Sequence, residues 1–354
     1  MIFEKMRLGK YTLQNKIAIS PMCQYSSING EPNSWHYSHY GNLIKSGAGM
    51  LCIESTSVSL AGKITKGDLA LYTKKQGLKF KEFVKFLKSI NKKVPIILQI
   101  SHAGRKASSY IPWVKNNKPL AKQFAWKTYA PSSLKKDKNW PLPEELNKNK
   151  INKIINEFVN TALLAKKSGF DGIEIHMAHG YLVHQFLSPI SNKRKDFWGG
   201  NNKNRMRFAI EITKRIKNVL KNKLIIGARI AATDHLKNGI SIKDGILLVK
   251  ELDNLKLDYF CLSSGGIKTK TKLNFKKGFR LKYCEYFKKK INAQITTVGG
   301  LDSLTKSQPF LKKNKINFLT IGRKFLLDSM WLFKLKDFSK ILKKTPKQYL
   351  RGFR

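Results

Sequence analysis

The stretch Gly172-Ile173-Glu174-Ile175-His176-Met177-Ala178-His179-Gly180-Tyr181 decides how the rest of the chain is interpreted. Ile173 and Ile175 alternate with small or polar residues, which favours a short β-strand, and Gly180 marks irregular backbone just beyond it. Two imidazoles and a phenol therefore follow the C-terminal end of a predicted strand. Parallel α/β sheets and barrels place their chemistry at that end of their strands.

Further β-branched runs recur along the chain, each followed by a longer amphipathic or Lys-rich segment of helical character. The predicted strands, in chain order, are Lys16–Ser20, Met50–Glu54, Pro95–Ile100, Gly172–His176, Leu224–Ile230, Asp258–Ser263, Gln294–Val298 and Asn317–Ile321. Eight strands that alternate with helices predict a single (β/α)8 barrel over residues 1–354. Several runs are apolar at consecutive positions, as parallel strands buried on both faces require. A doubly wound sheet is the second candidate, because periodicity does not report closure.

The chain has 354 residues, whereas a barrel of this kind typically needs about 250. The longest extra segment, residues 103–147, follows the third predicted strand. It carries Trp113, Trp126 and Trp140 and leads into a predicted helix, Ile151–Ser168. An aromatic-rich loop at the C-terminal face of a barrel is typical of a lid over a pocket, and a packed Ω-loop without a catalytic part fits the same residues.

Charge and cysteine content narrow the class of protein. The formal net charge is +47, and 42% of the residues are hydrophobic, which is enough for a buried core. Lysines occur on nearly every predicted surface rather than in one groove with interleaved aromatics, so no nucleic-acid partner is expected. The four cysteines lack CxxC spacing, so neither a zinc site nor a disulfide framework is predicted. No apolar run approaches the roughly 20 residues of a membrane span, and we expect a soluble cytoplasmic protein.

Polar residues follow several of the predicted strands at the same end of the barrel. They are Ser20 to Tyr25 after the first strand, Gln99, His102 and Arg105 at the third, His176, His179 and Tyr181 at the fourth, and Arg229 at the fifth. The seventh and eighth strands end in Gly299-Gly300 and Gly322-Arg323. Loops after these two strands are the usual phosphate site of a barrel, because glycine lets backbone N–H groups approach and arginine adds a forked donor. A phosphorylated cofactor is therefore predicted.

Each of these residues also has a plainer interpretation. His176 and His179 could be metal ligands, but no third ligand stands at a recognisable spacing, so no metal site is predicted. Cys23 alone is more simply a small core residue. His36 and His39 repeat the HxxH spacing on a predicted helix with no strand before it, and we interpret that pair as structural. The convergence of polar strand ends, not the spacing, supports an active site.

Five motifs occur in order along almost the whole chain. They are Ser20-Pro21-Met22-Cys23, His102-Ala103-Gly104-Arg105-Lys106, His176-Met177-Ala178-His179-Gly180-Tyr181, Ser188-Pro189-Ile190-Ser191-Asn192, and Asp196-Phe197-Trp198-Gly199-Gly200 with Asn204-Arg205. Together they resemble the old yellow enzymes, which are FMN-containing barrels. Cys23, the HxxH pair and the terminal Arg351-Gly352-Phe353 are similar to the bacterial NADPH dehydrogenase and xenobiotic reductase branch.

The resemblance implies a role for each matching position. The residues that would hold FMN are Ser20, Pro21, Met22, Cys23, Ser55, Gln99, Arg229, Gly300, Gly322 and Arg323. Among them, Gln99 and Arg229 would contact the flavin pyrimidine and Arg323 the phosphate. His176 and His179 would hydrogen-bond the substrate's carbonyl oxygen.

The same resemblance implies that Tyr181 is the proton donor, that Tyr25 lines the substrate pocket and that Cys23 tunes the flavin. Arg351, in a C-terminal tail over residues 337–354, would reach the pocket of a neighbouring subunit, which implies a homodimer or homotetramer. Two positions depart from the family pattern: Ser55 stands where this branch often has Ala, and Trp198 replaces a usual Tyr.

The implied activity is that of an NADPH dehydrogenase. It would reduce activated C=C bonds of α,β-unsaturated carbonyls, and nitro compounds, by ping-pong hydride transfer through FMN. The alternatives are an RNA-acting flavin barrel of the dihydrouridine synthase type, prompted by the charge of +47, and a flavin-free barrel lyase. The RNA-acting barrel would need a C-terminal helical domain, for which the chain beyond the eighth predicted strand is short.

Overall fold

The computed structural model describes residues 2–268, 278–301, 304–313, 315–335 and 346–353. Within this part of the chain, eight parallel strands are paired in the order β11-β10-β9-β8-β5-β4-β3-β12. Their bounds are β3 (Ile17–Ile19), β4 (Met50–Ser57), β5 (Ile96–Ser101), β8 (Gly172–Met177), β9 (Ile225–Ala231), β10 (Tyr259–Ser263), β11 (Gln294–Thr297) and β12 (Leu319–Ile321). All eight predicted strands are therefore confirmed, each with small shifts at its ends.

The two edge strands, β11 and β12, meet and close the sheet into a barrel. The Asn317 backbone N–H donates to the Ile295 carbonyl at 2.8 Å, and the Asn317 side-chain oxygen accepts from the Ile295 N–H at 2.8 Å. The hydroxyls of Thr296 and Thr320, 2.8 Å apart, join the same two strands. Closure excludes the doubly wound sheet and confirms the (β/α)8 barrel.

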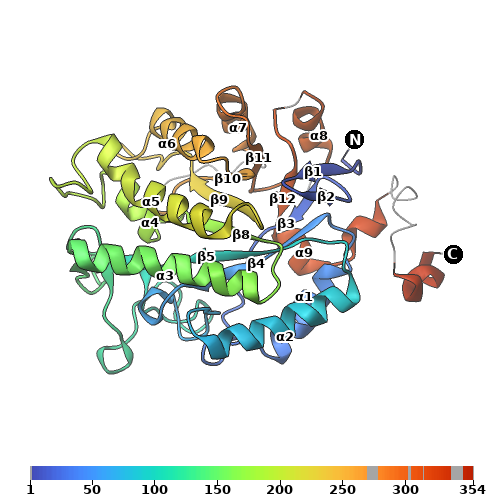
Figure 1. Ribbon diagram of the computed structural model, residues 1–354, viewed down its shortest axis with the longest axis horizontal. Helices are drawn as coiled ribbons and strands as arrows, with labels where there is room; N and C mark the ends of the chain where they lie inside the picture. Colours follow the sequence, from blue (N-terminus) through green and yellow to red (C-terminus); the bar gives the residue numbers. More distant parts are fainter. Residues whose placement is uncertain (1, 269–277, 302–303, 314, 336–345, 354) are drawn as a thin grey trace.

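Helices surround the barrel, as Figure 1 shows for α3, α5 and their neighbours. Their bounds are α1 (Ser34–Ile44), α2 (Lys74–Ile90), α3 (Lys148–Lys167), α4 (Leu182–Leu187), α5 (Asn202–Leu220), α6 (Ile242–Asn254), α7 (Leu281–Lys288), α8 (Leu304–Lys312) and α9 (Arg323–Leu327). The helix predicted over residues 151–168 is α3. It begins earlier than predicted because the Asn147 side chain caps it, accepting a hydrogen bond from the Lys150 N–H at 2.9 Å.

Strand side chains alternate between two apolar cores. Residues that point outward, such as Ile173 and Ile175 of β8, pack against the helices in the larger core. Residues that point inward, such as Ile97, Ile225 and Tyr259, fill the barrel itself. This alternation follows from the period of two along a strand. It assigns Glu174 and His176, which flank Ile175, to the barrel interior.

A short N-terminal hairpin covers the end of the barrel opposite the predicted chemistry. Its strands are β1 (Met6–Leu8) and β2 (Tyr11–Leu13), paired antiparallel. Leu8 and Leu13, both fully buried, belong to the barrel's interior core. The sequence did not predict this hairpin, because its strands are too short to establish a periodicity. The inner core therefore fills the N-terminal end of the barrel and leaves the other end to polar residues.

The inserted segment 103–147 has short structure of its own. It contains the 3-10 turns η2 (Gly104–Lys106) and η3 (Lys122–Phe124), and a parallel pair, β6 (Tyr129–Ala130) with β7 (Glu144–Glu145). Arg105 ties it together: its guanidinium donates to the backbone carbonyls of Leu134, Lys135 and Ile267. The insertion is thus anchored to the loop after β10.

The end of the described chain returns to the barrel's first helix. Within the described residues, two 3-10 turns follow α9: η4 (Trp331–Lys334) and η7 (Lys347–Phe353). Lys45, which follows α1, donates to the Tyr349 hydroxyl at 2.6 Å and lies 5.1 Å from that ring's centroid. Of the predicted tail over 337–354, residues 337–345 and 354 lie outside the described residues. Among the helices that the structure describes, none combines the length and the apolar character that a membrane crossing requires.

Candidate active site

The end of β8 and the turn between β8 and α4 carry the three proton-carrying residues singled out by the sequence. His179 and Gly180 both have left-handed backbone, with φ of 57° and 71°. At His179 this conformation costs about 1–3 kcal/mol, and such strain concentrates at functional sites. A side chain at Gly180 has no room, since its Cβ would lie 2.3 Å from the Gly266 carbonyl oxygen. Only glycine at position 180 therefore permits the turn.

Buried side chains hold this strained turn in place. The Gly180 N–H donates to His184 Nδ1 at 2.8 Å, and His184 Nε2 lies 2.8 Å from Asp234 Oδ1. Gln185 donates to the Gly180 carbonyl at 2.7 Å, and Lys106 Nζ donates to the His179 carbonyl at 2.5 Å. Because the amide of Gly180 can only donate, the His184 proton must be on Nε2, where it faces Asp234.

His176 and His179 are hydrogen-bonded to each other and not to a common acceptor. The Ala178 N–H donates to His176 Nδ1 at 3.2 Å, so the His176 proton lies on Nε2, 3.1 Å from His179 Nδ1. His179 Nε2 is then protonated and donates to Ser263 Oγ at 2.8 Å. Burial, reinforced by the charge of Arg229, holds the pKa of both imidazoles well below the usual range. Both rings are therefore neutral at pH 7, and each keeps one N–H donor.

Tyr181 lies in a small apolar cluster with Cys23, Tyr25 and Trp126. Its ring centroid is 4.7 Å from that of His176. Burial raises the pKa of the Tyr181 phenol well above its usual range, and burial likewise raises that of the Cys23 thiol. Both groups therefore keep their protons at neutral pH. The cluster brings together residues that follow β3, the fourth barrel strand β8 and the insertion.

A buried network lies behind the loop that carries Cys23. The Gln24 N–H donates to Glu54 Oε2 at 2.7 Å, and the Tyr40 hydroxyl donates to Glu54 Oε1 at 3.1 Å. Burial raises the pKa of Glu54 to about 8 and lowers that of His36 to about 4. Both are neutral at pH 7, so their 3.6 Å contact is not an ion pair. His36 also completes a capping box with Asn33 at the start of α1, which gives it a structural role.

A cavity of about 760 Å³ opens beside this turn, at the C-terminal ends of the strands. His179 lines it, with most of the residues predicted to hold the cofactor: Ser20, Pro21, Met22, Arg229, Gly300, Gly322 and Arg323. The predicted residues outside its lining are Cys23, Ser55 and Gln99. Ser55 instead lies 2.5 Å from the Ser101 hydroxyl, oxygen to oxygen, and Gln99 donates to Glu174 at 2.6 Å.

The cavity suits a ligand with a polar ring at one end and a phosphate at the other. Arg229 is buried, and its Nε has no hydrogen-bond partner among the described residues, which leaves a donor for a ligand atom. At the other end, Gly299 and Gly300 have φ of 113° and 63°, and a Cβ at Gly299 would lie 2.5 Å from Arg280 Nη1. Bare backbone flanked by Arg280 and Arg323 fits an anion.

Three residues of the site were not assigned from the sequence. Ser263, the hydrogen-bond partner of His179, is the last residue of the sixth predicted strand. Its place at a strand end could have identified it as a site residue. Arg280 donates to Ser264 Oγ at 2.8 Å and to the Val298 carbonyl at 3.0 Å, but it follows no strand and gave no signal. Lys106 was noted only within a motif. Its Nζ lies 5.8 Å from the Tyr181 ring centroid, and burial lowers its pKa to about 7.

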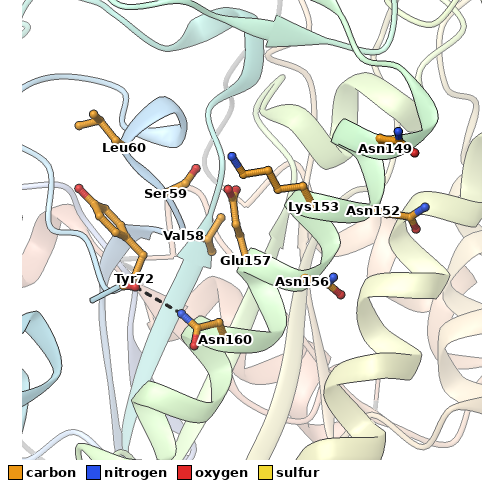
Figure 2. A pocket seen from close by; sticks show the side chains of 10 residues that line it. All are labelled: Val58, Ser59, Leu60, Tyr72, Asn149, Asn152, Lys153, Asn156, Glu157 and Asn160. Carbon is orange, nitrogen blue, oxygen red and sulfur yellow. Dashed lines mark hydrogen bonds between the residues drawn. The ribbon is translucent and has the colours of Figure 1, made fainter. Parts of the chain in front are cut away.

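A second cavity, of about 730 Å³, lies outside the barrel between α3 and the segment that follows β4 (Figure 2). A row of asparagines on α3 lines it. Arg215 of α5 donates to the side-chain oxygens of Asn152 and Asn156, and the Asn160 amide donates to the Tyr72 carbonyl at 3.3 Å. None of the predicted site residues lines this cavity, so we assign the chemistry to the barrel rim.

Sequence comparison with known proteins identifies relatives that match this chain over nearly its whole length. Residues 1–340 match the NADH:flavin oxidoreductase / NADH oxidase family. The chain is 33% identical to an NADPH dehydrogenase of Clostridium acetobutylicum, with 99% of each chain covered. It is 30% identical to an NADPH dehydrogenase of Bacillus subtilis, also with 99% of each covered.

Solved structures agree on the fold. Morphinone reductase superposes with a TM-score of 0.78 at 22% identity, covering 94% of this chain and 89% of the other. The old yellow enzyme homologue of Zymomonas mobilis superposes with a TM-score of 0.76 at 19% identity, covering 98% and 93%. Barrel, site geometry and full-length similarity together show that the chain belongs to the NADH:flavin oxidoreductase / NADH oxidase family and is an FMN-dependent oxidoreductase of the old yellow enzyme type.

Proposed function

We propose that the protein takes reducing equivalents from NADPH and uses them to reduce activated C=C bonds of α,β-unsaturated carbonyl compounds, and nitro compounds. One observation carries the proposal. His179 lines the cavity proposed for FMN and is hydrogen-bonded to His176, whose ring contacts Tyr181. A donor pair and a protonated phenol would therefore lie next to the cofactor. NADPH is favoured as the electron source because the full-length relatives are NADPH dehydrogenases.

FMN would lie in the cavity with Arg229 at its ring end and Arg323 at its phosphate end. The lining residues Ser20, Pro21, Met22, Gly300 and Gly322 would contact it, with Cys23, Ser55 and Gln99 close by. When bound, FMN would supply the two-electron chemistry, accepting a hydride from NADPH and passing it to the substrate. NADPH and substrate would use the same site in turn, which gives ping-pong kinetics.

The two histidines would hold the substrate's carbonyl oxygen. Reduction at the β-carbon puts negative charge on this oxygen, so donors fixed in advance lower the barrier where the charge develops. His176 Nε2–H is one such donor. In the structure without substrate, this proton points to His179, and His179 points to Ser263. Binding of a carbonyl oxygen by both rings would therefore require the Nε2–H of His176 to leave His179 and the Nε2–H of His179 to leave Ser263.

Tyr181 would give the proton that the α-carbon needs. A general acid must hold its proton at rest, and the raised pKa of the Tyr181 phenol ensures that it does. Lys106, beside the Tyr181 ring and with its pKa lowered to about 7, would ease the loss of the proton where it is protonated. Tyr25 would line the pocket, where its ring meets Trp113 of the insertion at 5.9 Å between centroids. Cys23, kept as a thiol, would adjust the flavin's potential.

The insertion and the C-terminal tail would complete the pocket. Trp126 joins the Tyr181 cluster and Trp113 contacts Tyr25, which supports a covering role for residues 103–147. Arg351 is exposed on η7, as a residue that contacts a second subunit would be in a single chain. We therefore propose a homodimer or homotetramer in which Arg351 contributes to a neighbouring pocket.

Anaerobic mixing tests the function directly. NADPH should bleach the visible absorbance of the bound flavin, and an enone should restore it without oxygen. Restoration by quinones or oxygen alone, with no consumption of any enone or nitro compound in a broad screen, would contradict the proposal. Comparing NADPH with NADH in the first step tests the choice of donor.

A further inference from the structure

Glu174 is a buried carboxylate inside the barrel that the proposed chemistry leaves without a role. It lies on β8 and is 2% exposed. Gln99 Nε2 on β5 donates to its Oε1 at 2.6 Å, and the Tyr259 hydroxyl on β10 donates to its Oε2 at 3.0 Å. Each oxygen thus has a donor, one from either side of β8. Burying a carboxylate is costly, so its presence beneath a ligand cavity calls for a function.

The contact between Glu174 and Tyr259 is possible because the strand between these two residues has a glycine where the Tyr259 side chain crosses it. Strand β9 lies between β8 and β10, and its Gly227 is the register partner of both Glu174 and Tyr259. A Cβ at Gly227 would lie 2.2 Å from the Tyr259 ring. The phenol can therefore cross β9 and reach Glu174 only because position 227 is glycine. Three strands cooperate to present two donors to one carboxylate.

Glu174 determines which way the Gln99 amide faces. Both oxygens of Glu174 accept a hydrogen bond, so the carboxylate carries no proton and the NH2 group of Gln99 points to it. The carbonyl oxygen of Gln99 and its second N–H are then left for another partner. A ligand that approaches Gln99 from the side of this oxygen is therefore offered an acceptor. Without Glu174, the amide could rotate and offer a donor instead.

Glu174 also faces an unbalanced positive charge. Arg229 follows Gly227 by two residues on β9 and points to the same side of the strand. Within the described part of the chain, no carboxylate forms an ion pair with Arg229. Burial raises the pKa of Glu174, and the charge of Arg229 opposes this rise. The two groups are therefore electrostatically coupled across adjacent strands.

We propose that Glu174 is a positioning residue for FMN, which turns the Gln99 oxygen toward the flavin and offsets part of the charge of Arg229. In this way Glu174 limits how strongly the site prefers reduced over oxidised FMN. The inference rests on the proposed contacts of Gln99 and Arg229 with the flavin. It extends them to a residue that has no flavin contact of its own.

Glu174→Gln tests the charge while retaining the shape. The variant should bind oxidised FMN about as tightly as the parent, because a glutamine oxygen can still accept from Gln99. Reduced FMN should bind about tenfold more tightly, since Arg229 would lose its counter-charge. The measurements are the dissociation constant of oxidised FMN and the midpoint potential of the bound flavin, which should rise. An unchanged potential would overturn the electrostatic part of the proposal.

Glu174→Leu tests the orientation of Gln99. The affinity for oxidised FMN should fall by about tenfold, because the side-chain amide of Gln99 is no longer held in one orientation. Tyr259→Phe removes one donor that favours the ionised form of Glu174, so it should shift the potential in the same direction as Glu174→Gln, by less. Asp258→Asn is the control: its carboxylate also accepts from a residue of a neighbouring strand, the Ile226 N–H at 2.7 Å, but at the opposite end of the barrel. It should leave the potential unchanged, and an equal shift there would overturn the proposal.

Two more variants separate this inference from the function on which it rests. Gln99→Leu and Arg229→Met test the flavin contacts themselves and should each weaken FMN. If neither does, the assigned FMN site is wrong. If both variants weaken FMN binding, but Glu174→Gln and Tyr259→Phe have the same midpoint potential as the parent, the FMN site is right and only the role of Glu174 is wrong. Thermal unfolding of each apoprotein reports whether a variant is folded.

Discussion

The residues of the site act through their hydrogen-bonding states. One backbone amide, that of Ala178, forces the proton of His176 onto Nε2, and this choice passes through His179 to Ser263. Because both imidazoles stay neutral, they can donate to an oxygen without carrying a charge that would have to be neutralised. Burial raises the pKa of the Tyr181 phenol, so Tyr181 keeps a proton that it can donate beside the two imidazoles.

Tyr181→Phe should separate the two half-reactions. Loss of a general acid costs about 10²–10⁴-fold in rate, so the reduction of an enone by the reduced enzyme should slow by that order. Reduction of the flavin by NADPH needs no proton from Tyr181 and should proceed as in the parent. Stopped-flow absorbance under anaerobic conditions measures each step. Equal slowing of both steps would show that the phenol shapes the site and does not donate the proton.

Glu54→Gln should change how stability depends on pH. The folded-state pKa of Glu54 is raised to about 8 from a usual 4.5, so between these values the unfolded chain has lost a proton that the folded chain keeps. Its contribution to stability is thus complete below about 4.5 and is lost as pH rises toward 8, by about 1.4 kcal/mol per pH unit. The variant should show a flatter decline across this window.

Urea unfolding at a series of pH values measures this effect. Glu82→Gln, at an exposed position on α2, is the control and should retain the parent's slope. The buried histidines make stability depend on pH in the opposite direction, and they do so at lower pH. Burial lowers the pKa of His102 to about 3 and that of His36 to about 4, so stability should fall as the solution is acidified below the usual value of 6.5. A slope for Glu54→Gln equal to the parent's would contradict the buried, protonated state of Glu54.

At the scale of elements, the barrel depends on glycines at positions where a side chain would not fit. Gly180 permits the turn after β8, and Gly227 lets Tyr259 cross β9. Polar networks then tie neighbouring elements at the rim: His184 and Asp234 join α4 to the loop after β9, and Arg105 joins the insertion to the loop after β10. Each connection fixes a loop at the rim of the barrel.

Gly227→Ala and Gly77→Ala form a matched pair. The Cβ at position 227 would press on the Tyr259 ring at 2.2 Å inside the barrel, and overpacking of this kind costs about 1–3 kcal/mol. At Gly77 in α2, the Cβ would meet Leu164 at 3.5 Å, which is ordinary contact. Replacing glycine in a helix should stabilise the protein by about 0.5–1 kcal/mol. Denaturant midpoints at constant m-value measure both, and a stabilised Gly227→Ala would contradict the packing described.

At the scale of the whole molecule, closure of the sheet brings distant parts of the chain to one rim. The N-terminal hairpin fills the opposite end with Leu8 and Leu13, and the cavity opens at the C-terminal ends of the strands. The Lys45–Tyr349 contact brings the described part of the C-terminus to the molecule's edge beside α1.

Arg351→Ala should weaken the binding of a phenolic ligand if the tail completes a neighbouring pocket. A hydrogen bond to a charged group contributes about 1.5–3 kcal/mol, so affinity should fall by roughly tenfold or more. Lys347→Ala, an exposed cation on the same 3-10 turn, should leave the affinity unchanged. Titration of the flavin absorbance measures binding, and light scattering measures the mass in solution. A monomeric parent protein with full affinity in Arg351→Ala would refute the role of the tail.

Much of the fold was readable from the residues because strands and helices leave local periodicities. Ile96-Ile97-Leu98 and Leu224-Ile225-Ile226 indicate strands buried on both faces, and all eight runs became barrel strands. The HxxH pair with Tyr181 was placed at the rim for the same reason. The hairpin β1–β2 and the pair β6–β7 were missed because strands of two or three residues are too short to show a period.

Sequence by itself thus determined the eight alternating strands and the polar residues at their ends, since these depend on local order along the chain, and its motifs gave the resemblance to a flavin family. Tertiary structure alone decided that the sheet closes through Asn317 and Ile295, that His179 pairs with Ser263, and that Arg280 lines the cavity. It also decided that Glu174 lies between Gln99 and Tyr259. These contacts join residues far apart in the chain, and burial and distance, which set protonation and hydrogen bonding, exist only once the chain has folded.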